Sequence, residues 1–345
     1  MGESLSLVAQ INASYYKGLT MLKIGVLGLG HLGKIHVKCI KMIDQYELVG
    51  VFDIHAATRA KVAEEYDVKA FDSLEALIDA VDVVDIVTPT ITHYELAQKV
   101  IAKGKHFFIE KPITHTLKEA QALCALVQDK NIKAQVGHVE RFNPALLAIE
   151  NKNLNPMFIE VHRLAMFNPR GTDVSVVLDL MIHDLDIILT LIPHPVRSVQ
   201  ASGVAIVSPS ADIANARIEF ENGAIVNITA SRISMKNMRK LRVFQSDAYL
   251  SLDFLNKKIE VVRIHETAPN NNCMELDTTL GKRYIELDMP EAQPNNAIKM
   301  ELESFAHSIS NNLPTKVGLE DGLNALKLAY WIMDEIEAHQ ARVKK

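Results

Sequence analysis

Residues 23–43 read KIGVLGLGHLGKIHVKCIKMI, which is a short apolar strand, a glycine-rich turn and a helical pattern. Gly28, Gly30 and Gly33 have the spacing GxGxxG. Between a strand and a helix, such glycines allow a tight turn, close approach of a pyrophosphate and close packing of helix on strand. The stretch therefore predicts a dinucleotide-binding βαβ unit, with expected cofactor contacts at Gly28, Gly30, His31, Leu32 and Gly33.

A second strand, expected at residues 48–52, ends in Asp53, about twenty residues after Gly33. A carboxylate at this place binds the ribose hydroxyls of adenosine and disfavours a 2′-phosphate. We therefore expect NAD rather than NADP. Arg59 complicates this interpretation, because a nearby arginine can accommodate a 2′-phosphate.

The alternation of strands and helices continues to about residue 140, which predicts a doubly wound parallel sheet over residues 21–140. Ligands of such sheets bind at the carboxyl ends of the strands. Three loops lie there: TPTITH at 88–93, EKP at 110–112 and GHVERFNPA at 137–145. The first two supply the remaining expected cofactor contacts, Thr88, Thr90, His93, Glu110 and Lys111.

Residues 176–189, VVLDLMIHDLDIIL, predict a helix that is apolar on most of its circumference but carries four ionisable residues. On an α-helix, Asp179, His183 and Asp186 share one narrow stripe. Burying an unpaired ionisable group costs several kcal/mol, so the stripe must face groups that use it. From the residues alone, Lys111 is either a functional group or a surface lysine paired with Glu110.

In this order, GLGHLG at 28–33, Asp53, the TPT loop, EKP and the DxxxH spacing from Asp179 to His183 resemble the glucose-fructose oxidoreductase and inositol dehydrogenase family. The resemblance runs from about Met21 to the C-terminus. It implies an N-terminal Rossmann domain and a C-terminal α+β domain with an open, mostly antiparallel sheet. It also implies that Lys111, Asp179 and His183 surround the substrate and that no metal is used.

The second half agrees with that architecture, since residues 141–345 predict several strands and two closing helices. Strands are expected at 158–163, 197–207, 215–221, 224–231 and 240–245, a loop or loose hairpin at 265–281, and helices at 296–309 and 319–337. The last helix is expected to pack partly on the first domain. Residues 1–20, ahead of Met21, are expected to be an appendage.

Oxidation of a secondary alcohol removes a hydroxyl proton while a hydride moves to the nicotinamide. His183 suits the general base because its ordinary pKa is near neutrality. Lys111 would stabilise the developing alkoxide, and Asp179 would orient the substrate or His183. For Asp186, a direct role and a role in orienting His183 or capping a neighbour both remain open.

The segments 137–145 and 162–181 most resemble the branch of the family that oxidises the 3-hydroxyl of UDP-N-acetylglucosamine and related UDP-sugars. A diphosphate needs cations, so the expected substrate contacts are Arg141, Asn143, Arg163 and Arg170, although each arginine could be an ordinary surface residue. Two alternatives remain. A dehydrogenase of free polyols or monosaccharides would share this core, and a non-catalytic NAD sensor would not need Lys111 or the Asp179/His183 pair.

Composition excludes several partners. A formal net charge of -5 gives no basic field for nucleic acid or an anionic membrane. Three widely spaced cysteines predict neither a disulfide framework nor a zinc site, and no signal peptide or membrane span is recognisable, so we expect a cytoplasmic protein. An open sheet with an uncovered apolar face would be a liability, which favours a homodimer or homotetramer through the C-terminal sheet.

Overall fold

The computed structural model describes residues 21–150, 152, 154–168, 174–269, 273–279 and 281–343. The expected appendage at 1–20 and Arg170 lie outside these residues. The chain divides into two compact units. The first comprises Met1–Gly137 and Ile298–Leu319, and the second comprises His138–Ala297 and Glu320–Lys345.

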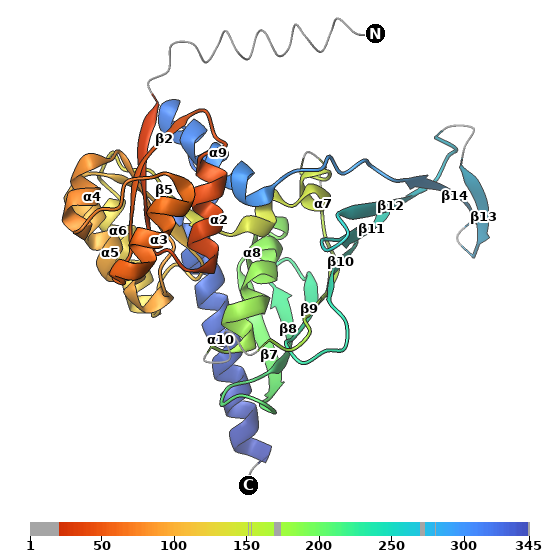
Figure 1. Ribbon diagram of the computed structural model, residues 1–345. Coiled ribbons are helices and arrows are strands. Elements are labelled where there is room, and N and C mark those ends of the chain that lie inside the picture. The colour runs from red at the N-terminus through yellow and green to blue at the C-terminus, as the bar shows by residue number, and fades with distance from the viewer. Residues whose placement is uncertain are drawn as a thin grey trace, which may run out of the picture. The chain divides into compact units, whose positions relative to one another are not determined.

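The first unit contains a five-stranded parallel sheet in the order β2-β1-β3-β4-β5, flanked by helices (Figure 1). This confirms the predicted doubly wound sheet. Its strands are β1 (Leu22–Leu27), β2 (Tyr46–Phe52), β3 (Val83–Ile86), β4 (His106–Glu110) and β5 (Ala134–Gly137). Its first helices are α2 (His31–Ile40), α3 (Ala56–Tyr66), α4 (Leu74–Ala80), α5 (His93–Ala102) and α6 (Leu117–Val127).

The helix α9 (Ala297–Ser310) belongs almost entirely to the first unit, although it is distant in sequence. Its side chains Leu302, Phe305 and Ala306 are buried in one cluster with Ile24 and Phe108 of the sheet. We expected one boundary near residue 140 and the last helix on the first domain. Instead, α9 contributes to the core of this unit, whereas α10 (Leu319–Val343) groups with the second unit from Glu320 onward.

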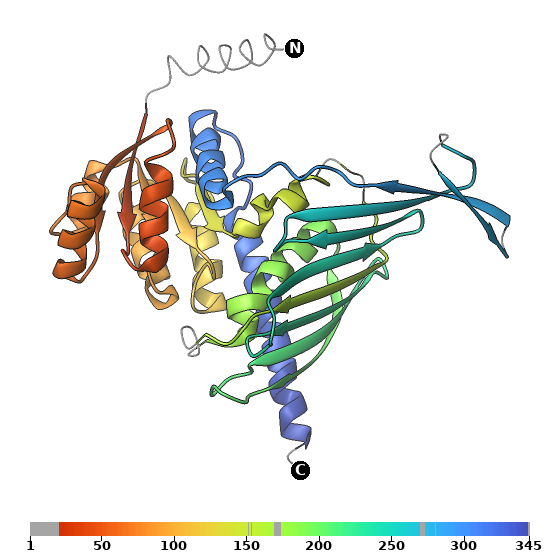
Figure 2. The same ribbon diagram turned by 45° about the vertical axis from the view of Figure 1, so that its right-hand side comes forward.

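The second unit is built on a nine-stranded sheet in the order β13-β14-β12-β11-β10-β6-β9-β8-β7 (Figure 2). All neighbouring strands are antiparallel except β6 and β9, which confirms the expected, mostly antiparallel sheet. The strands are β6 (Phe158–Leu164), β7 (Val196–Val204), β8 (Ile213–Phe220), β9 (Ile225–Ser231), β10 (Met238–Phe244), β11 (Ala248–Asp253), β12 (Lys258–His265), β13 (Met274–Thr278) and β14 (Gly281–Asp288).

Strands β11, β12 and β14 were not among the expected strands, and the expected loop or loose hairpin at 265–281 contains β13 and ends at the first residue of β14. In β11, buried and half-buried residues alternate along AYLSLD, which is the period of a strand with one face toward a core. The residues of β13 are all exposed, so the alternation of apolar and polar residues in MELDT does not place one face of this strand in a core.

The two faces of the large sheet differ in character. In β8, Ala214, Ala216 and Ile218 are buried, whereas Asn215 and Arg217 between them are exposed. Helices α8 (Ile182–Leu191) and α10 lie on one side of the sheet, and among the described residues no helix covers the other (Figure 2). The open face is therefore more polar than expected.

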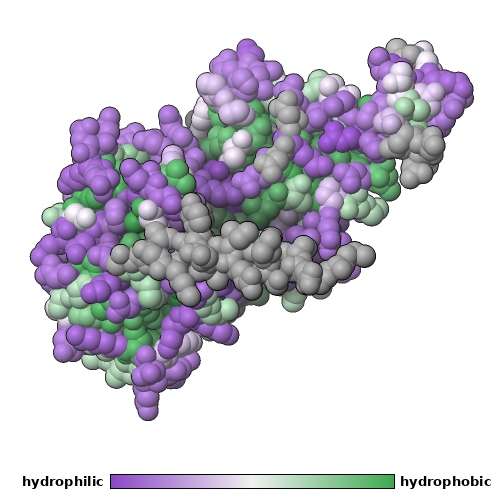
Figure 3. All heavy atoms as spheres, turned by 90° about the horizontal axis from the view of Figure 1, so that it is seen from above, coloured by the Kyte–Doolittle hydropathy of each residue, from purple (hydrophilic) through white to green (hydrophobic). Residues whose placement is uncertain are grey.

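The molecular face in Figure 3 is mostly hydrophilic, with smaller apolar patches between the charged side chains. Among the residues placed by the structure, no helix combines the length and the apolar character needed to cross a membrane.

Candidate active site

The glycine-rich turn between β1 and α2 shows why two of its glycines are needed. Gly28 has a φ of 91°, which disfavours side chains, and a Cβ at Gly33 would lie 1.9 Å from the carbonyl oxygen of Gly28. A Cβ at Gly30 would meet nothing within 4 Å. Gly28 and Gly33 thus serve the fold, whereas the open space at Gly30 suits a ligand that must approach the backbone closely.

A pocket of about 890 Å³ opens beside this turn, a size suited to a nucleotide cofactor. Most of the predicted cofactor residues line it: Gly28, Gly30, His31, Leu32, Gly33, Asp53, Thr88, Glu110 and Lys111. The first turn of α2 has no side-chain cap, so its backbone N–H groups are directed to the site where a phosphate would bind.

Asp53 is held in place by the turn itself. Its Oδ2 accepts a hydrogen bond of 2.8 Å from the Leu29 N–H, and its Oδ1 accepts one of 2.9 Å from the His55 N–H. Arg59 donates to the backbone oxygen of Asp53 at 2.7 Å and stacks on Phe52, with 5.4 Å from its guanidinium carbon to the ring centroid. Arg59 is thus committed to the fold, which weakens the argument that it serves a 2′-phosphate.

Two predicted cofactor contacts, Thr90 and His93, are absent from the pocket lining. His93 is fully buried, and its ring nitrogens lie 3.0 Å from the Pro112 oxygen and 2.9 Å from the Thr88 oxygen. Burial lowers the pKa of His93. The His93 ring thus ties the EKP loop to the end of β3, and the predicted cofactor contact at His93 stays a prediction.

The sequence did not lead us to several other lining residues, among them Ile54, Ser73, Leu74, Thr92, Leu96 and Lys99. Ile54 follows Asp53 and is 80% exposed, a large apolar side chain open to solvent beside the expected ribose site. The apolar Ile54 directly after Asp53 could have been used to predict a contact with the adenine ring.

Lys111 is half-buried at the end of β4 and lines the same pocket. Its backbone N–H donates to Oε2 of Glu110 at 3.1 Å. Gly137 at the end of β5 makes room for that carboxylate, since a Cβ there would lie 2.7 Å from Oε1 of Glu110. The EKP loop therefore presents both an acid and a lysine at the carboxyl edge of the sheet.

In the second unit, the helix with the acidic residues begins as a π-helix over Val177–Met181 and continues as α8. Asp179 lies in the π-helical turn, and His183 lies in the first turn of α8. Both side chains are half-buried, and the His183 ring packs edge-on against the His138 ring at 6.4 Å between centroids. Single π-helical turns within α-helices occur frequently at functional sites.

The other two acids of this helix hold arginines. Asp186 accepts two hydrogen bonds from Arg141, at 2.6 and 2.8 Å, and both side chains are buried. Arg141 also lies 3.5 Å from Asp321 of α10. Arg141 was expected to contact substrate and Asp186 to act on His183 or a neighbour; instead, the two form a buried ion pair within the unit.

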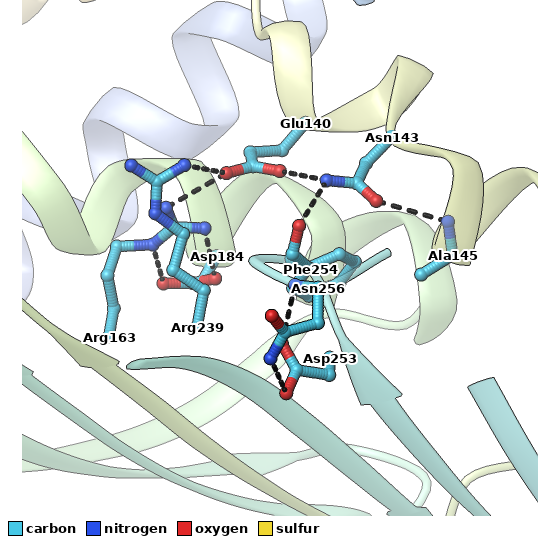
Figure 4. A network of polar contacts seen from close by, with 9 residues as sticks. All are labelled: Glu140, Asn143, Ala145, Arg163, Asp184, Arg239, Asp253, Phe254 and Asn256. Carbon is cyan, nitrogen blue, oxygen red and sulfur yellow. Dashed lines mark hydrogen bonds and ion pairs between the residues drawn. The ribbon is translucent and has the colours of Figure 1, made fainter. Parts of the chain in front are cut away.

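Arg163 is likewise committed to the fold. It donates to Asp184 at 2.6 and 2.9 Å and to Glu140 at 3.0 Å, as Figure 4 shows. Burial alone would lower the pKa of Arg163, but the charges and hydrogen bonds of Asp184 and Glu140 raise it, so the guanidinium stays charged. A buried charge needs its partners, and Arg163 has them in Asp184 and Glu140; its predicted contact with substrate stays a prediction.

Asn143 completes this network rather than facing a ligand. Its amide nitrogen donates to Glu140 at 3.0 Å and to the Phe254 oxygen at 3.1 Å, while its oxygen caps the short helix α7 (Pro144–Leu147) at the Ala145 N–H (Figure 4). The loop 137–145 therefore links α8 to the sheet, and its conspicuous polar residues are structural.

Comparison with known proteins agrees with both units. Residues 22–138 match the model of the oxidoreductase family with an NAD-binding Rossmann fold, and residues 159–251 match the GFO/IDH/MocA C-terminal domain. The chain belongs to the GFO/IDH/MocA oxidoreductase family. This confirms the family resemblance drawn from the motifs.

Among its relatives, the chain is 36% identical to the UDP-N-acetylglucosamine 3-dehydrogenase of Acidithiobacillus ferrooxidans, over 93% of this chain and 99% of that protein. A solved structure of that dehydrogenase superposes with a TM-score of 0.84 at 34% identity, again over 93% and 99% of the two chains. The inositol 2-dehydrogenase of Rhizobium meliloti is 26% identical over 89% of this chain and 94% of its own length.

Proposed function

We propose that this oxidoreductase uses NAD to oxidise the 3-hydroxyl of a UDP-N-acetylhexosamine to a 3-keto sugar nucleotide. The observation that carries the proposal is the similarity to the UDP-N-acetylglucosamine 3-dehydrogenase over nearly the full length of both proteins. It is supported by a pocket that combines the glycine turn, Asp53 and Lys111. A ketone product at C3 would suit an aminotransferase acting next.

In this reaction, His183 takes the proton of the substrate hydroxyl as a general base. Lys111 donates a hydrogen bond to the same oxygen and stabilises the alkoxide charge as the hydride leaves the carbon. Asp179 orients the substrate or His183. NAD supplies the redox chemistry as the hydride acceptor.

The proposed diphosphate contacts change with the structure. Because Arg141 and Arg163 are paired with Asp186 and Asp184, cations outside these pairs must bind the UDP group. Arg170 remains a candidate. Contacts to a diphosphate distant from C3 would supply binding energy that holds C3 against the nicotinamide.

The cofactor preference gives a first prediction. Asp53→Ala should raise the dissociation constant of NAD on the order of tenfold and narrow its preference over NADP, because the ribose hydroxyls lose their acceptor. Titration of both cofactors by protein fluorescence measures this. Asp129→Ala is the matched control, since Asp129 is exposed and does not line the pocket. Tighter binding of NADP than NAD by the unmodified protein would contradict our interpretation of Asp53.

Thermal shift with NAD present tests the substrate class. A ligand that binds the native state raises the melting temperature, so UDP-N-acetylglucosamine should raise it and inositol should not. The rival is a dehydrogenase of free polyols, which the inositol dehydrogenase relative favours and which would give the opposite ranking. A melting temperature raised by NAD alone, and by no sugar or polyol, would favour an NAD sensor.

We also propose that the enzyme works in the cytoplasm as a homodimer or homotetramer through the open face of the large sheet. That face carries polar pairs, such as Arg242 with Glu160 at 2.8 Å and Asn215 with Thr229 at 2.8 Å. An interface there would be polar rather than apolar.

A further inference from the structure

Four ionisable side chains from four separate elements meet in the core of the first unit. His36 of α2, Asp85 of β3 and Glu301 of α9 are 0% exposed, and Glu110 of β4 is 8% exposed. Only Glu110 among them lines the cofactor pocket. The other three have no role in the mechanism proposed above, yet burial of such groups is costly unless they stabilise one another.

The side chains form a chain of contacts that ends at the pocket. Nδ1 of His36 lies 2.9 Å from Oδ2 of Asp85, and Nε2 lies 3.3 Å from Oε1 of Glu110. The other oxygen of Glu110 accepts the backbone N–H of Lys111 at 3.1 Å. Glu301 completes the group, because one ligand atom each of His36, Glu110 and Glu301 lie within 4.8 Å of one another.

Hydrogen-bond acceptors outnumber donors in this group. Within the described part of the chain, neither carboxylate oxygen of Glu301 has a hydrogen-bond partner, and Oδ1 of Asp85 has none. Nε2 of His36 is 3.3 Å from Oε1 of Glu110 as an ion-pair contact, without the geometry of a hydrogen bond. An ionised carboxylate buried next to the carboxylates of Glu110 and Asp85 would be strongly destabilised. A proton on Glu301 removes one negative charge and supplies a missing donor.

The electrostatics of the four groups agree with this arrangement. Burial, and then the charge of Glu110, raise the pKa of Glu301 well above its ordinary value. Burial alone would lower the pKa of His36, but Asp85 and Glu110 raise it well above its ordinary value. Burial alone would raise the pKa of Glu110, but His36 and Lys111 lower it.

We propose that Glu301 is protonated and that, with His36 and Asp85, it forms a proton-sharing network that holds the Glu110 carboxylate ionised and fixed at the floor of the cofactor pocket. His36, Asp85 and Glu301 are positioning residues, since they act on the pocket only through Glu110. Through its bond to the Lys111 N–H, the network also fixes the backbone that carries this lysine. Only this last consequence rests on the proposed function.

The proton on Glu301 can be tested by the sign of a stability change. A carboxyl whose pKa is raised on folding loses stabilising free energy as the pH rises from its unfolded towards its folded pKa. Glutamine keeps a donor and cannot ionise. Glu301→Gln should therefore match the unmodified protein near pH 5 and exceed its melting temperature by about 2–4 °C near pH 8.5.

The titratable groups that act on Glu301, namely Glu110, His36 and Asp85, are all kept in this variant. Glu303→Gln is the matched control on the same helix, because Glu303 is partly exposed and paired with Lys299. It should show no gain that grows with pH. A melting temperature lowered by Glu301→Gln across the whole range would overturn the proposal. So would one equivalent of metal per chain that Glu301→Gln removes.

Turnover tests the positioning role. His36→Asn should lower turnover on the order of tenfold while the dissociation constant of NAD stays within about threefold, since residues that orient a functional group affect its chemistry most. Glu303→Gln, the control on the same helix, should keep turnover within about twofold, because Glu303 lies outside the network. Full turnover in His36→Asn would contradict the positioning role.

If His36→Asn does not fold, the pH dependence of Glu301→Gln still decides the protonation of Glu301. If no sugar is oxidised by any form of the protein, the proposed function fails. The melting temperatures would still stand as a separate test of the network.

Discussion

Alanine in place of Lys111 is expected to lower turnover on the order of 10²-fold or more, while NAD still binds. The lysine is expected to stabilise charge that develops on the substrate oxygen only as the reaction proceeds, so its loss affects the transition state more than the bound cofactor. The phosphates and ribose are expected to bind at the glycine turn and Asp53, which the substitution leaves intact. Steady-state kinetics with NAD titration measures both effects.

Lys99→Ala is the matched control, because Lys99 lines the same pocket but is exposed and paired with Glu95 at 3.2 Å. Its turnover should stay close to that of the unmodified protein. His183→Ala should behave like Lys111→Ala, because we propose that both residues act on the same hydroxyl. Full activity in either variant would remove that residue from the mechanism.

The second large effect concerns stability. Arg163→Met should destabilise the protein by about 3–5 kcal/mol, because it leaves the buried charge of Asp184 without its ion-pair partner and removes one of the donors to Glu140. The midpoint of urea unfolding reports the change. Arg242→Met is the control, since its pair with Glu160 is partly exposed and worth at most about 1 kcal/mol.

This pair of variants also separates two roles for Arg163. If it is structural, stability falls and the KM for the sugar nucleotide in the remaining folded protein changes little. Unchanged stability with a strongly raised KM would restore the prediction that Arg163 contacts substrate.

The first unit was predictable because its determinants are local. The glycine spacing, the distance to Asp53 and the alternation of strands and helices all lie within short windows of sequence. Most of the cofactor residues predicted from these windows line the pocket. The contribution of α9 could not be found this way, because Leu302 and Phe305 reach the core only through tertiary packing.

The acidic helix shows where local reasoning ends. Its stripe was derived with a constant rotation of about 100° per residue, whereas the structure contains a π-helical turn over Val177–Met181. Two of the acids pair with arginines from elsewhere in the unit. Asp184 pairs with Arg163 of β6, and Asp186 pairs with Arg141 in the loop after β5. Such pairs join residues that are distant in the sequence, so no periodic pattern in the sequence predicts them.

The most direct test of the proposed function is NADH formation from NAD with UDP-N-acetylglucosamine, free N-acetylglucosamine and inositol in parallel. Each assay is repeated with 2-oxoglutarate as an acceptor, in case NADH stays bound to the enzyme. We predict NADH and a 3-keto product from the UDP-sugar, with much slower turnover of the free sugar because the remote UDP contacts are lost. NADH from inositol and from no UDP-sugar would contradict the account.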